Sequence, residues 1–317
     1  MRIVIASGKG GAGKTTVTAC LAAQWERQLL LVDADVEAPN LHLLLHPDLE
    51  EPEPVYLEVP ELVTEKCTGC GACRPMCAYG AIAMMGAKPM YFQDMCHGCG
   101  GCFAVCPEQA LAVARRELGA LLQGFVVAGG KKSAFLMGRT RVGEAMTPPL
   151  LRAQERKLAG MLAQSPATHP ATHPAEHPAE HQTDVLMDAP PGVSCPAMTA
   201  ARGADAVLLV AEPTPFGFYD FRLAHAAFAQ LGRPIAVVVN RAGMEGNEDC
   251  ENELRAWCAG AGVPILAELP FERAAAHAYA HGLPPTEAQG ATGQEWRQRF
   301  AVLAGKLRAF AEGVSHA

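Results

Sequence analysis

A glycine-rich stretch near the start of the chain has the residue types and the spacing that bind phosphate. It consists of Gly8, Lys9, Gly10, Gly11, Ala12, Gly13, Lys14, Thr15 and Thr16. Backbone N–H groups of such a stretch can close around a polyphosphate, and the N-terminus of a following helix favours its negative charge. Lys14 can then reach the β- and γ-phosphates, and the Thr15 hydroxyl is placed to ligate Mg²⁺. The stretch therefore predicts a site for a nucleotide and Mg²⁺.

Eight of the twelve cysteines form two runs with the same short spacing. The runs are Cys67, Cys70, Cys73 and Cys77, then Cys96, Cys99, Cys102 and Cys106. This spacing resembles that of bacterial two-cluster ferredoxins, in which the last cysteine of each run ligates the other cluster. The resemblance implies two [4Fe–4S] clusters, one on Cys67, Cys70, Cys73 and Cys106 and the other on Cys96, Cys99, Cys102 and Cys77. Zinc is the alternative metal, because paired C-x-x-C motifs also build zinc sites, but the duplicated longer run favours iron–sulfur clusters.

Two apolar runs farther along end in acidic residues. The run at 29–32 leads into Asp33 and Asp35, and the run at 185–187 leads into Asp188. Ligand-binding groups of open parallel sheets gather at the carboxyl ends of strands, so we expect these acids to face the phosphate site. Asp33 has two interpretations, a Mg²⁺-shell or structural acid and a cap for the following helix.

Lys9 gives the glycine-rich stretch a second lysine, in the pattern Lys-Gly-Gly-x-Gly-Lys-Thr. This pattern resembles the deviant Walker A motif of the MinD-like ATPases, which include the nitrogenase iron protein and the iron–sulfur scaffold ATPases. The resemblance implies that the nucleotide is ATP and that the protein hydrolyses it. It also implies a homodimer in which Lys9 reaches the nucleotide of the partner; a solvated loop charge is the alternative for this lysine.

The same resemblance implies roles for residues at other strand ends. Asp35 would help to position the attacking water, and Asp188 would hold Mg²⁺ through water. The amide of Gly192 would sense the γ-phosphate. Asn240, Arg241 and Pro270 would lie beside the base, although asparagine after a strand is also an ordinary turn residue.

The elements that must position these groups alternate between apolar strands and helical patterns. We expect strands at 3–6, 29–35, 184–188, 206–210, 235–239 and 265–269, and helices at 17–23, from 196, and at 148–164 and 218–231. Such alternation predicts an α/β fold, a doubly wound, mostly parallel sheet of the P-loop NTPase type. Glycine-rich segments at 121–127, 133–138 and 140–145 predict short strands or hairpins.

The cysteine runs interrupt this alternation. We expect residues 1–57 and 116–317 to form the ATPase domain and residues 58–115 to form an inserted small α+β ferredoxin-like domain. Residues 165–182 hold Pro-Ala-Thr-His and Pro-Ala-Glu-His repeats, and proline at every fourth position removes helical hydrogen bonds, which predicts a linker. Metal binding by the repeat histidines is the alternative; they are His169, His173, His177 and His181.

Outside the two runs, Cys20, Cys250 and Cys258 are expected in the core. Cys195 follows Asp188 closely and could be a redox-sensitive or cluster-handling thiol. A final helix at 293–312 has an apolar face and basic residues elsewhere, and we expect it to pack on the sheet, with a membrane surface as the alternative.

The bulk composition limits the class of protein. A chain of 317 residues can hold one large α/β domain and a small one. A formal charge of −7 argues against nucleic acid as the main partner. No run approaches the ~18 apolar residues of a membrane span, and the chain starts directly with a predicted strand. We therefore expect a cytoplasmic protein that does not bind membranes.

Three functions are compatible with these motifs. In the first, ATP drives assembly or transfer of iron–sulfur clusters onto a protein client. In the second, hydrolysis gates electron transfer from the clusters to a redox partner. A spatial organiser of the MinD kind is the third, and it leaves the eight cysteines without a role.

Overall fold

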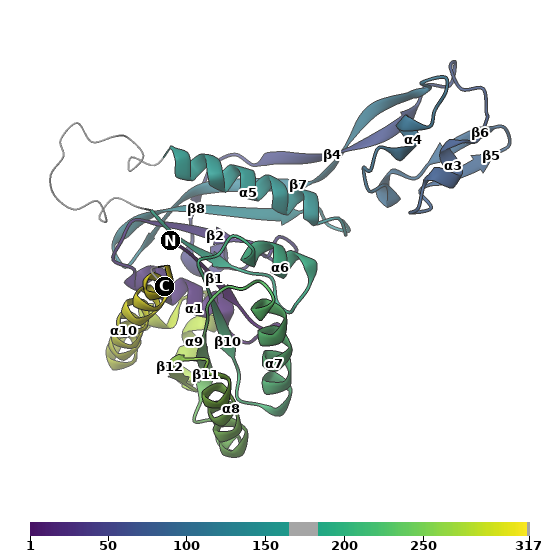
Figure 1. The fold of residues 1–317 in the computed structure, drawn as a ribbon. Helices are drawn as coiled ribbons and strands as arrows, with labels where there is room; N and C mark the ends of the chain where they lie inside the picture. Colours follow the sequence, from purple (N-terminus) through teal and green to yellow (C-terminus); the bar gives the residue numbers. More distant parts are fainter. Residues whose placement is uncertain (165–182, 316–317) are drawn as a thin grey trace.

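A computed structural model describes residues 1–164 and 183–315. Its main body is a twisted sheet with helices on both faces, and a thin two-stranded ribbon carries a small additional unit away from it (Figure 1). The strand order in the sheet is β12-β11-β10-β1-β9-β2-β8-β7-β3, and β4 pairs with β7. The expected α/β class, with a mostly parallel sheet, is confirmed.

The parallel part of the sheet carries the residues that were expected to bind nucleotide. Its strands are β1 (Arg2–Ala6), β2 (Leu29–Asp33), β9 (Asp184–Asp188), β10 (Ala206–Ala211), β11 (Ile235–Ala242) and β12 (Ile265–Pro270), together with β8 (Lys131–Thr140) beside β2. Almost every residue of β1, β2, β9 and β10 is buried, because helices cover both faces of the sheet. Side chains alternate between two cores, with Ile3 and Ile5 in one and Val4 and Ala6 in the other.

Each core is closed by its own set of helices. One core includes side chains from α1 (Lys14–Gln24), α2 (Leu41–Leu45), α9 (Arg273–Ala280) and α10 (Gly290–Ser315). The other includes side chains from α5 (Pro148–Ala163), α6 (Cys195–Ala201), α7 (Pro215–Ala229) and α8 (Glu248–Ala261). A short 3-10 helix, Pro285–Glu287, precedes α10.

The glycine-rich segments after residue 110 form one long hairpin and not several short strands. Strand β7 runs from Leu111 to Ala128 and pairs antiparallel with β8 through a turn at Gly129 and Gly130. Thr140 ends β8, and 141–145 contains a turn where we expected a strand. Strand β7 continues through Gly124. A Cβ at this position would lie 2.0 Å from the Asp48 carbonyl oxygen of β3 (Asp48–Leu49), so a residue without a side chain is needed there. This glycine allows close strand approach and is not a break.

The cysteine-bearing unit is connected to the sheet by β4 (Glu53–Leu62) and β7. These strands pair from Glu53 opposite Leu121 to Leu62 opposite Leu111. Beyond them, residues 63–110 hold α3 (Cys73–Met76), β5 (Ile82–Met85), β6 (Lys88–Tyr91), a 3-10 turn (Gln93–Met95) and α4 (Gly101–Ala104). The boundaries proposed at 57/58 and 115/116 fall inside β4 and β7, which run through both positions as continuous strands.

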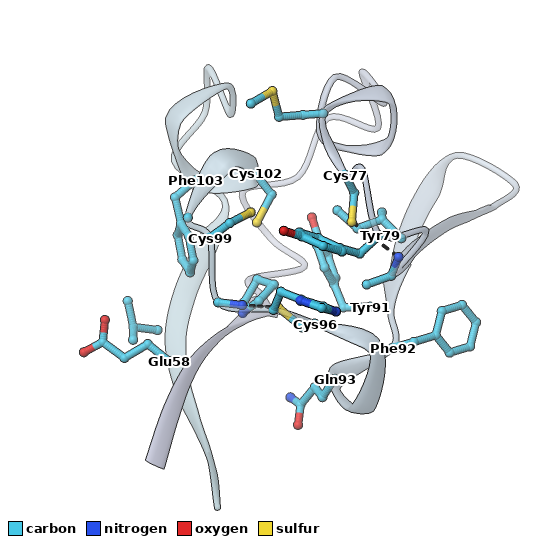
Figure 2. Close-up of a pocket in the computed structure, with 18 residues that line it drawn as sticks. Glu58, Cys77, Tyr79, Tyr91, Phe92, Gln93, Cys96, Cys99, Cys102 and Phe103 are labelled. Carbon is cyan, nitrogen blue, oxygen red and sulfur yellow. Dashed lines mark hydrogen bonds between the residues drawn. The ribbon is translucent and has the colours of Figure 1, made fainter. Parts of the chain in front are cut away.

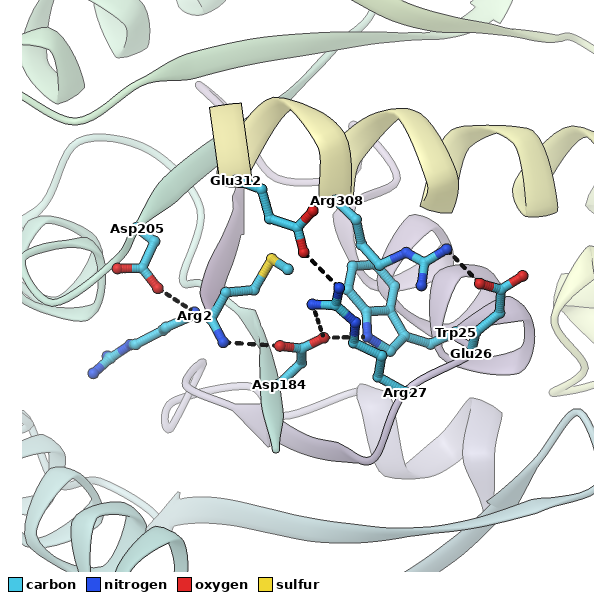
Figure 3. A network of polar contacts seen from close by, with 9 residues as sticks. Arg2, Trp25, Glu26, Arg27, Asp184, Asp205, Arg308 and Glu312 are labelled. Atoms are coloured by element: carbon cyan, nitrogen blue, oxygen red, sulfur yellow. Dashed lines mark hydrogen bonds and ion pairs between the residues drawn. The ribbon is translucent and has the colours of Figure 1, made fainter. Parts of the chain in front are cut away.

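The last helix packs against α1 and β12, as the sequence led us to expect. Trp296, Phe300, Leu303 and Leu307 on α10 are between 0% and 3% exposed. The basic Arg308 pairs with Glu26, and Arg27 bonds Glu312 at 2.6 Å (Figure 3). No helix among the described residues is long and apolar enough to cross a membrane.

Buried Asp184 ties the start of the chain to the end of α1. It accepts a bond from the Met1 amino group at 2.8 Å and one from the indole nitrogen of Trp25 at 3.0 Å, and Arg27 lies 4.0 Å away (Figure 3). Three donors surround this carboxylate because an unpaired buried charge would be costly. The contacts fix β1, α1 and β9 relative to one another.

Candidate functional site

The glycine-rich loop joins the carboxyl end of β1 to the first residue of α1, Lys14. Gly11 and Gly13 have φ values of 77° and 98°, a backbone conformation that favours glycine. A Cβ on Gly8 would lie 2.1 Å from the carbonyl oxygen of Asp220, so only glycine lets α7 approach the loop. The Lys14 side chain is nearly buried at the start of α1. The sequence therefore forms the expected helix-capped phosphate loop.

Asp188 lies at the end of β9 directly beside the loop. Thr15 Oγ1 donates to Asp188 Oδ2 at 2.6 Å, and Thr18 Oγ1 lies 3.5 Å from Oδ1. The structure thus brings together the two side chains expected to share Mg²⁺. Burial raises the pKa of Asp188 to about 6, although Lys14 and the Thr15 hydroxyl act in the opposite direction. A bound cation would favour the ionised carboxylate.

Asp33 lies opposite Asp188 in the pairing of β2 with β9 and is fully buried. Its carboxylate accepts backbone N–H bonds from Asp35 at 3.1 Å, Asn40 at 3.0 Å and Leu41 at 2.9 Å. Burial, and then the charge of Asp188, raises its pKa. These contacts match the interpretation of Asp33 as a cap, because they hold the segment between β2 and α2.

Asp35 stands at the start of that segment, where its charge interacts with Lys14. Its carboxylate accepts a bond from the Ala38 N–H at 3.3 Å. Burial raises its pKa above the ordinary value. The side chain expected to position water therefore lies near the loop and is held by backbone N–H groups of its own segment, those of Glu37 and Ala38.

Lys9 is paired within its own chain in this structure. Its Nζ lies 2.5 Å from Glu212 Oε2, and Arg241 Nη1 lies 2.5 Å from the other oxygen of the same carboxylate. Glu212 directly follows the buried strand β10, so it lies at the carboxyl end of a strand like Asp33 and Asp188. Sequence reasoning missed this residue. Burial raises the pKa of Glu212, but its two cationic partners outweigh that effect and lower the pKa overall.

Asn240 and Arg241 contact the loop backbone. Asn240 Nδ2 donates to the Ala12 carbonyl at 2.8 Å, and Arg241 Nη2 donates to the Gly11 carbonyl at 3.2 Å. Arg241 has a φ of 61° and lies at an irregularity in the pairing of β11 with β12, where Ala242 pairs with Pro270. Bulges of this kind redirect a side chain, here toward the loop.

Gly192 also has an in-chain partner. Its φ is 78°, and its N–H donates to the Ser7 carbonyl at 2.9 Å. The amide expected to sense the γ-phosphate would have to exchange this bond for one to nucleotide.

Four cysteines of the inserted unit line one cavity of about 130 Å³ (Figure 2). They are Cys77, Cys96, Cys99 and Cys102, the set that the ferredoxin resemblance assigns to one cluster. The Ala81 N–H lies 3.3 Å from the Cys77 sulfur, and the Gly98 N–H lies 3.4 Å from the Cys96 sulfur. Backbone donors of this kind are among the groups that tune iron–sulfur clusters.

The other four cysteines are Cys67, Cys70, Cys73 and Cys106. The Ala110 N–H donates to the Cys106 sulfur at 3.2 Å. Tyr91, which sequence reasoning missed, lies near both sets. Burial is the largest cause that raises the pKa of Tyr91. A hydrogen bond with Cys73 and the charges of Cys73, Cys102 and Cys106 raise it further. Tyr91 therefore lies close to cysteines of both sets.

None of the twelve cysteines forms a disulfide bond. Among the residues that the structure describes, no group of three or more His, Cys, Asp or Glu side chains could hold a metal ion as placed. A [4Fe–4S] cluster takes each thiolate on a different iron, so its ligands surround a larger volume than those of a single ion. Iron–sulfur clusters therefore stay a prediction, which rests on the cysteine spacing and on the cavity that four of the cysteines share.

The remaining cysteines are distributed as follows. Cys20 and Cys258 are buried as expected, and burial raises the pKa of their thiols to about 12 and about 11. Cys250 is only partly buried. Cys195 is exposed at the start of α6. The histidine repeat and the predicted linker lie outside the described residues.

The sheet and its loop define a P-loop ATPase with strand-end acids around the phosphate site. The family described as "CobQ/CobB/MinD/ParA nucleotide binding domain" matches residues 3–285, and the chain belongs to this family. Its members are nucleotide-binding ATPases.

Relatives and solved structures agree with this family. An uncharacterized protein of Methanocaldococcus jannaschii is 31% identical over 223 residues, which cover 69% of this chain and 70% of that protein. A second uncharacterized protein of that organism is 27% identical over 247 residues, covering 77% and 81%. The cell division ATPase MinD of Pyrococcus furiosus superposes with a TM-score of 0.52 at 21% identity, covering 97% of this chain and 98% of that one, which shows a shared fold.

Proposed function

We propose that this protein is a Mg²⁺-dependent ATPase that couples ATP binding and hydrolysis to the assembly or transfer of iron–sulfur clusters on a protein client. The observation that carries the proposal is that one chain joins a P-loop site to a unit where four cysteines, spaced as cluster ligands, line a single cavity. Membership of the ATPase family supports the first half of the proposal. The cysteine spacing supports the second.

The ATPase half needs no covalent catalysis. Lys14 would neutralise charge on the β- and γ-phosphates, Thr15 would ligate Mg²⁺, and Asp188, which bonds Thr15, would hold the ion through water. Asp35 would orient the attacking water. Hydrolysis then depends on positioning and on charge neutralisation, so small movements of these side chains control the rate.

Lys9 would act in a homodimer, across from the nucleotide of the second copy. For this it must leave Glu212, to which it is bound within the chain. Asn240, Arg241 and Pro270 would lie beside the base once the loop is occupied. The MinD of Pyrococcus horikoshii has been solved with Mg-ADP, and the MinD of Aquifex aeolicus with MinC, which supports Mg-nucleotide and a protein partner by analogy. We place the protein in the cytoplasm.

In the cysteine half, Cys67, Cys70, Cys73 and Cys106 would hold one cluster and Cys96, Cys99, Cys102 and Cys77 the other. Such clusters carry single electrons or are handed on intact. Cys70 and Cys99 are exposed, so each set has a side open to a client. The backbone N–H bonds to the sulfurs of Cys77, Cys96 and Cys106 would orient these three ligands.

ATP-gated electron transfer is the second candidate. It is favoured by the position of Tyr91 near both ligand sets, since closely spaced sets would let an electron pass between clusters. A MinD-type organiser agrees with the fold match but gives the cysteines no role.

The deciding experiment follows radiolabelled iron in the anaerobically reconstituted protein. Transfer predicts that iron moves to a purified apo [4Fe–4S] acceptor protein, faster with Mg-ATP. Electron transfer predicts that iron stays on the protein while pre-reduced clusters give their electrons to oxidised methyl viologen, which is reduced only when Mg-ATP is hydrolysed. A chain that binds no iron and no sulfide under these conditions overturns both and leaves the organiser.

Cys99→Ser should lower iron content, whereas the matched control Cys195→Ser, an exposed cysteine outside the runs, should keep it.

A further inference from the structure

A buried ion pair lies at the foot of the cysteine-bearing unit. Arg116, on β7, is 6% exposed, and its guanidinium pairs with Glu144, which is 3% exposed. The second guanidinium nitrogen, Nη2, donates to the carbonyl of Cys96 at 3.2 Å. One side chain therefore links a candidate cluster ligand to the segment that follows β8.

The surrounding charges are much more exposed. Asp94 is 85% exposed and lies 4.0 Å from Arg116 and 3.4 Å from Arg141. Exposed pairs of this kind contribute little. A buried pair differs, because removal of one partner leaves the other charge without compensation. The Arg116–Glu144 pair is thus the part of this cluster that holds the Cys96 loop.

The segment that carries Glu144 also contacts the residues after β2 at the nucleotide site. The Thr140 N–H donates to the Val36 carbonyl at 2.8 Å, and Val36 follows Asp35 directly. A Cβ on Gly138 would lie 2.7 Å from Val36 Cγ1, so β8 and this residue are in close contact. Movement of Asp35 toward a γ-phosphate would therefore act on the end of β8.

A second connection runs through α5, which begins shortly after Glu144. Gln154 of α5 is buried, and its Nε2 donates to the main-chain carbonyl of Asp33 at 2.7 Å. Glu144 Oε1 in turn accepts the Met146 N–H at 2.8 Å just before this helix. The segment 138–154 therefore contacts the end of β2 and the residues after it at several points. Through Arg116, the same segment also contacts the Cys96 loop.

We propose that the Arg116–Glu144 pair is the joint through which the nucleotide-bound position of residues 33–41 changes the Cys96 loop. ATP binding draws Asp35 toward the phosphates, shifts the end of β8, and alters the hold of Arg116 on the Cys96 carbonyl. The inference rests on the proposed function where it takes Cys96 as a cluster ligand. It specifies how that function is regulated: the loop opens or closes one ligand set according to nucleotide state. Coupling of this kind requires a contiguous chain of contacts, which these bonds provide.

The test is hydrogen–deuterium exchange on the full chain after anaerobic incubation with iron and sulfide, with and without a non-hydrolysable ATP analogue and Mg²⁺. In the unaltered protein, peptides covering 33–41 and 94–98 should both change on nucleotide binding. We expect a change of about fivefold or more at 94–98, the lower end of ordinary allosteric coupling. Glu144→Gln should keep the change at 33–41 and lose the change at 94–98.

Arg115→Gln is the matched control, because Arg115 neighbours Arg116 on the same strand but is exposed. It should behave as the unaltered protein. If thermal melting indicates that Glu144→Gln does not fold, Arg116→Lys tests the same joint, since lysine keeps the charge but has no fork to reach Glu144 and Cys96 together. Persistence of the 94–98 change in the folded variants overturns the joint, as does its absence from the unaltered protein when 33–41 responds.

Iron content, measured separately, distinguishes the two levels of the proposal. Coupling in a chain that binds no iron leaves the joint in place and removes the cluster function. Iron binding without coupling overturns the joint and leaves the cluster function in place.

Discussion

The nucleotide site and the cysteine unit differ in how far the fold itself completes them. At the nucleotide site, Thr15 already bonds Asp188, Lys9 already pairs with Glu212, and Gly192 already bonds Ser7. In the cysteine unit, most of the thiols are partly or fully exposed. Backbone N–H groups donate hydrogen bonds to three of the sulfurs. The sheet builds the first site, whereas the geometry of the second would be fixed by the clusters that we propose it binds.

The cause of the difference is the amount of buried surface. The strands that end at the nucleotide site run through two cores and are almost entirely buried. Within residues 63–110, the buried apolar side chains are Cys73, Ala81, Ile82, Pro89 and Ala110. A unit with so small a core gains little stability from apolar burial, so metal binding would supply much of its folding free energy.

The largest expected effect belongs to the preformed site. Lys14→Ala should lower the ATPase rate by about 10² to 10³, because it removes charge stabilisation from the transferring phosphate. The iron content of the cysteine unit should stay unchanged. A steady-state ATPase assay measures the rate, with Lys66→Ala, an exposed lysine on the insert, as control. Normal hydrolysis by Lys14→Ala would refute the site assignment.

The second prediction concerns the stability of the cysteine unit. Removing iron and sulfide from reconstituted protein should raise hydrogen exchange in residues 63–110 by at least about tenfold, because cluster binding and folding are coupled there. Peptides of β1, β9 and β10 should not respond. Equal protection of 63–110 in both forms would mean that the unit folds without metal, and the contrast between the two regions would disappear.

A third prediction concerns the stability cost of Asp188. Its pKa is raised to about 6 in the folded chain, so ionisation costs stability above that pH, and the cost vanishes as the pH falls through 6 toward the unfolded value of 3.8. Asp188→Asn should therefore stabilise the nucleotide-free protein at pH 7.5 by up to about 3 kcal/mol, and progressively less toward pH 4. Urea melts across this range measure the gain, and a gain that grows toward pH 4 contradicts the sign.

The smallest effect concerns the in-chain partner of Lys9. Glu212→Gln should lower the ATP concentration needed for dimerisation by about threefold to tenfold, since releasing Lys9 from a partly buried pair costs about 1 kcal/mol. Light scattering at graded ATP concentrations measures this shift. Lys9→Ala, the companion variant, should not dimerise. Unchanged or weaker dimerisation of Glu212→Gln would mean that the pair does not restrain Lys9.

The sequence was most informative where chemistry follows from local pattern. An apolar run that ends in an acid predicts a buried strand with a functional carboxyl end, and Asp188 lies where that rule puts it. Glu212 satisfies the same rule, but its role depends on Lys9 and Arg241, which lie far away in the chain. Asn240 bonds a carbonyl 228 residues away, a pairing that no local pattern encodes.

Errors arose where one residue type serves two purposes. The glycines of 121–138 were interpreted as breaks between short strands, but Gly124 and Gly138 allow close packing inside long ones. The sequence also left Asp33 between a Mg²⁺-shell acid and a cap, and in the structure its carboxylate accepts bonds from three backbone amides. Only the three-dimensional arrangement distinguishes these uses.

Strand β7 belongs to the sheet at one end and to the cysteine unit at the other. From Gly119 onward it pairs with β8, and before that point it pairs with β4 alone, with an irregularity between Val55 and Tyr56 opposite the junction. Leu118 lies at this pivot, and its carbonyl accepts the Arg141 N–H at 2.8 Å. The free part of the ribbon reaches seven residues farther to Leu111, about 24 Å at the usual rise of a strand. A bend of about 10° at Leu118 would displace the end of the ribbon by roughly 4 Å, so a small change at this one position is enlarged at the cysteine unit.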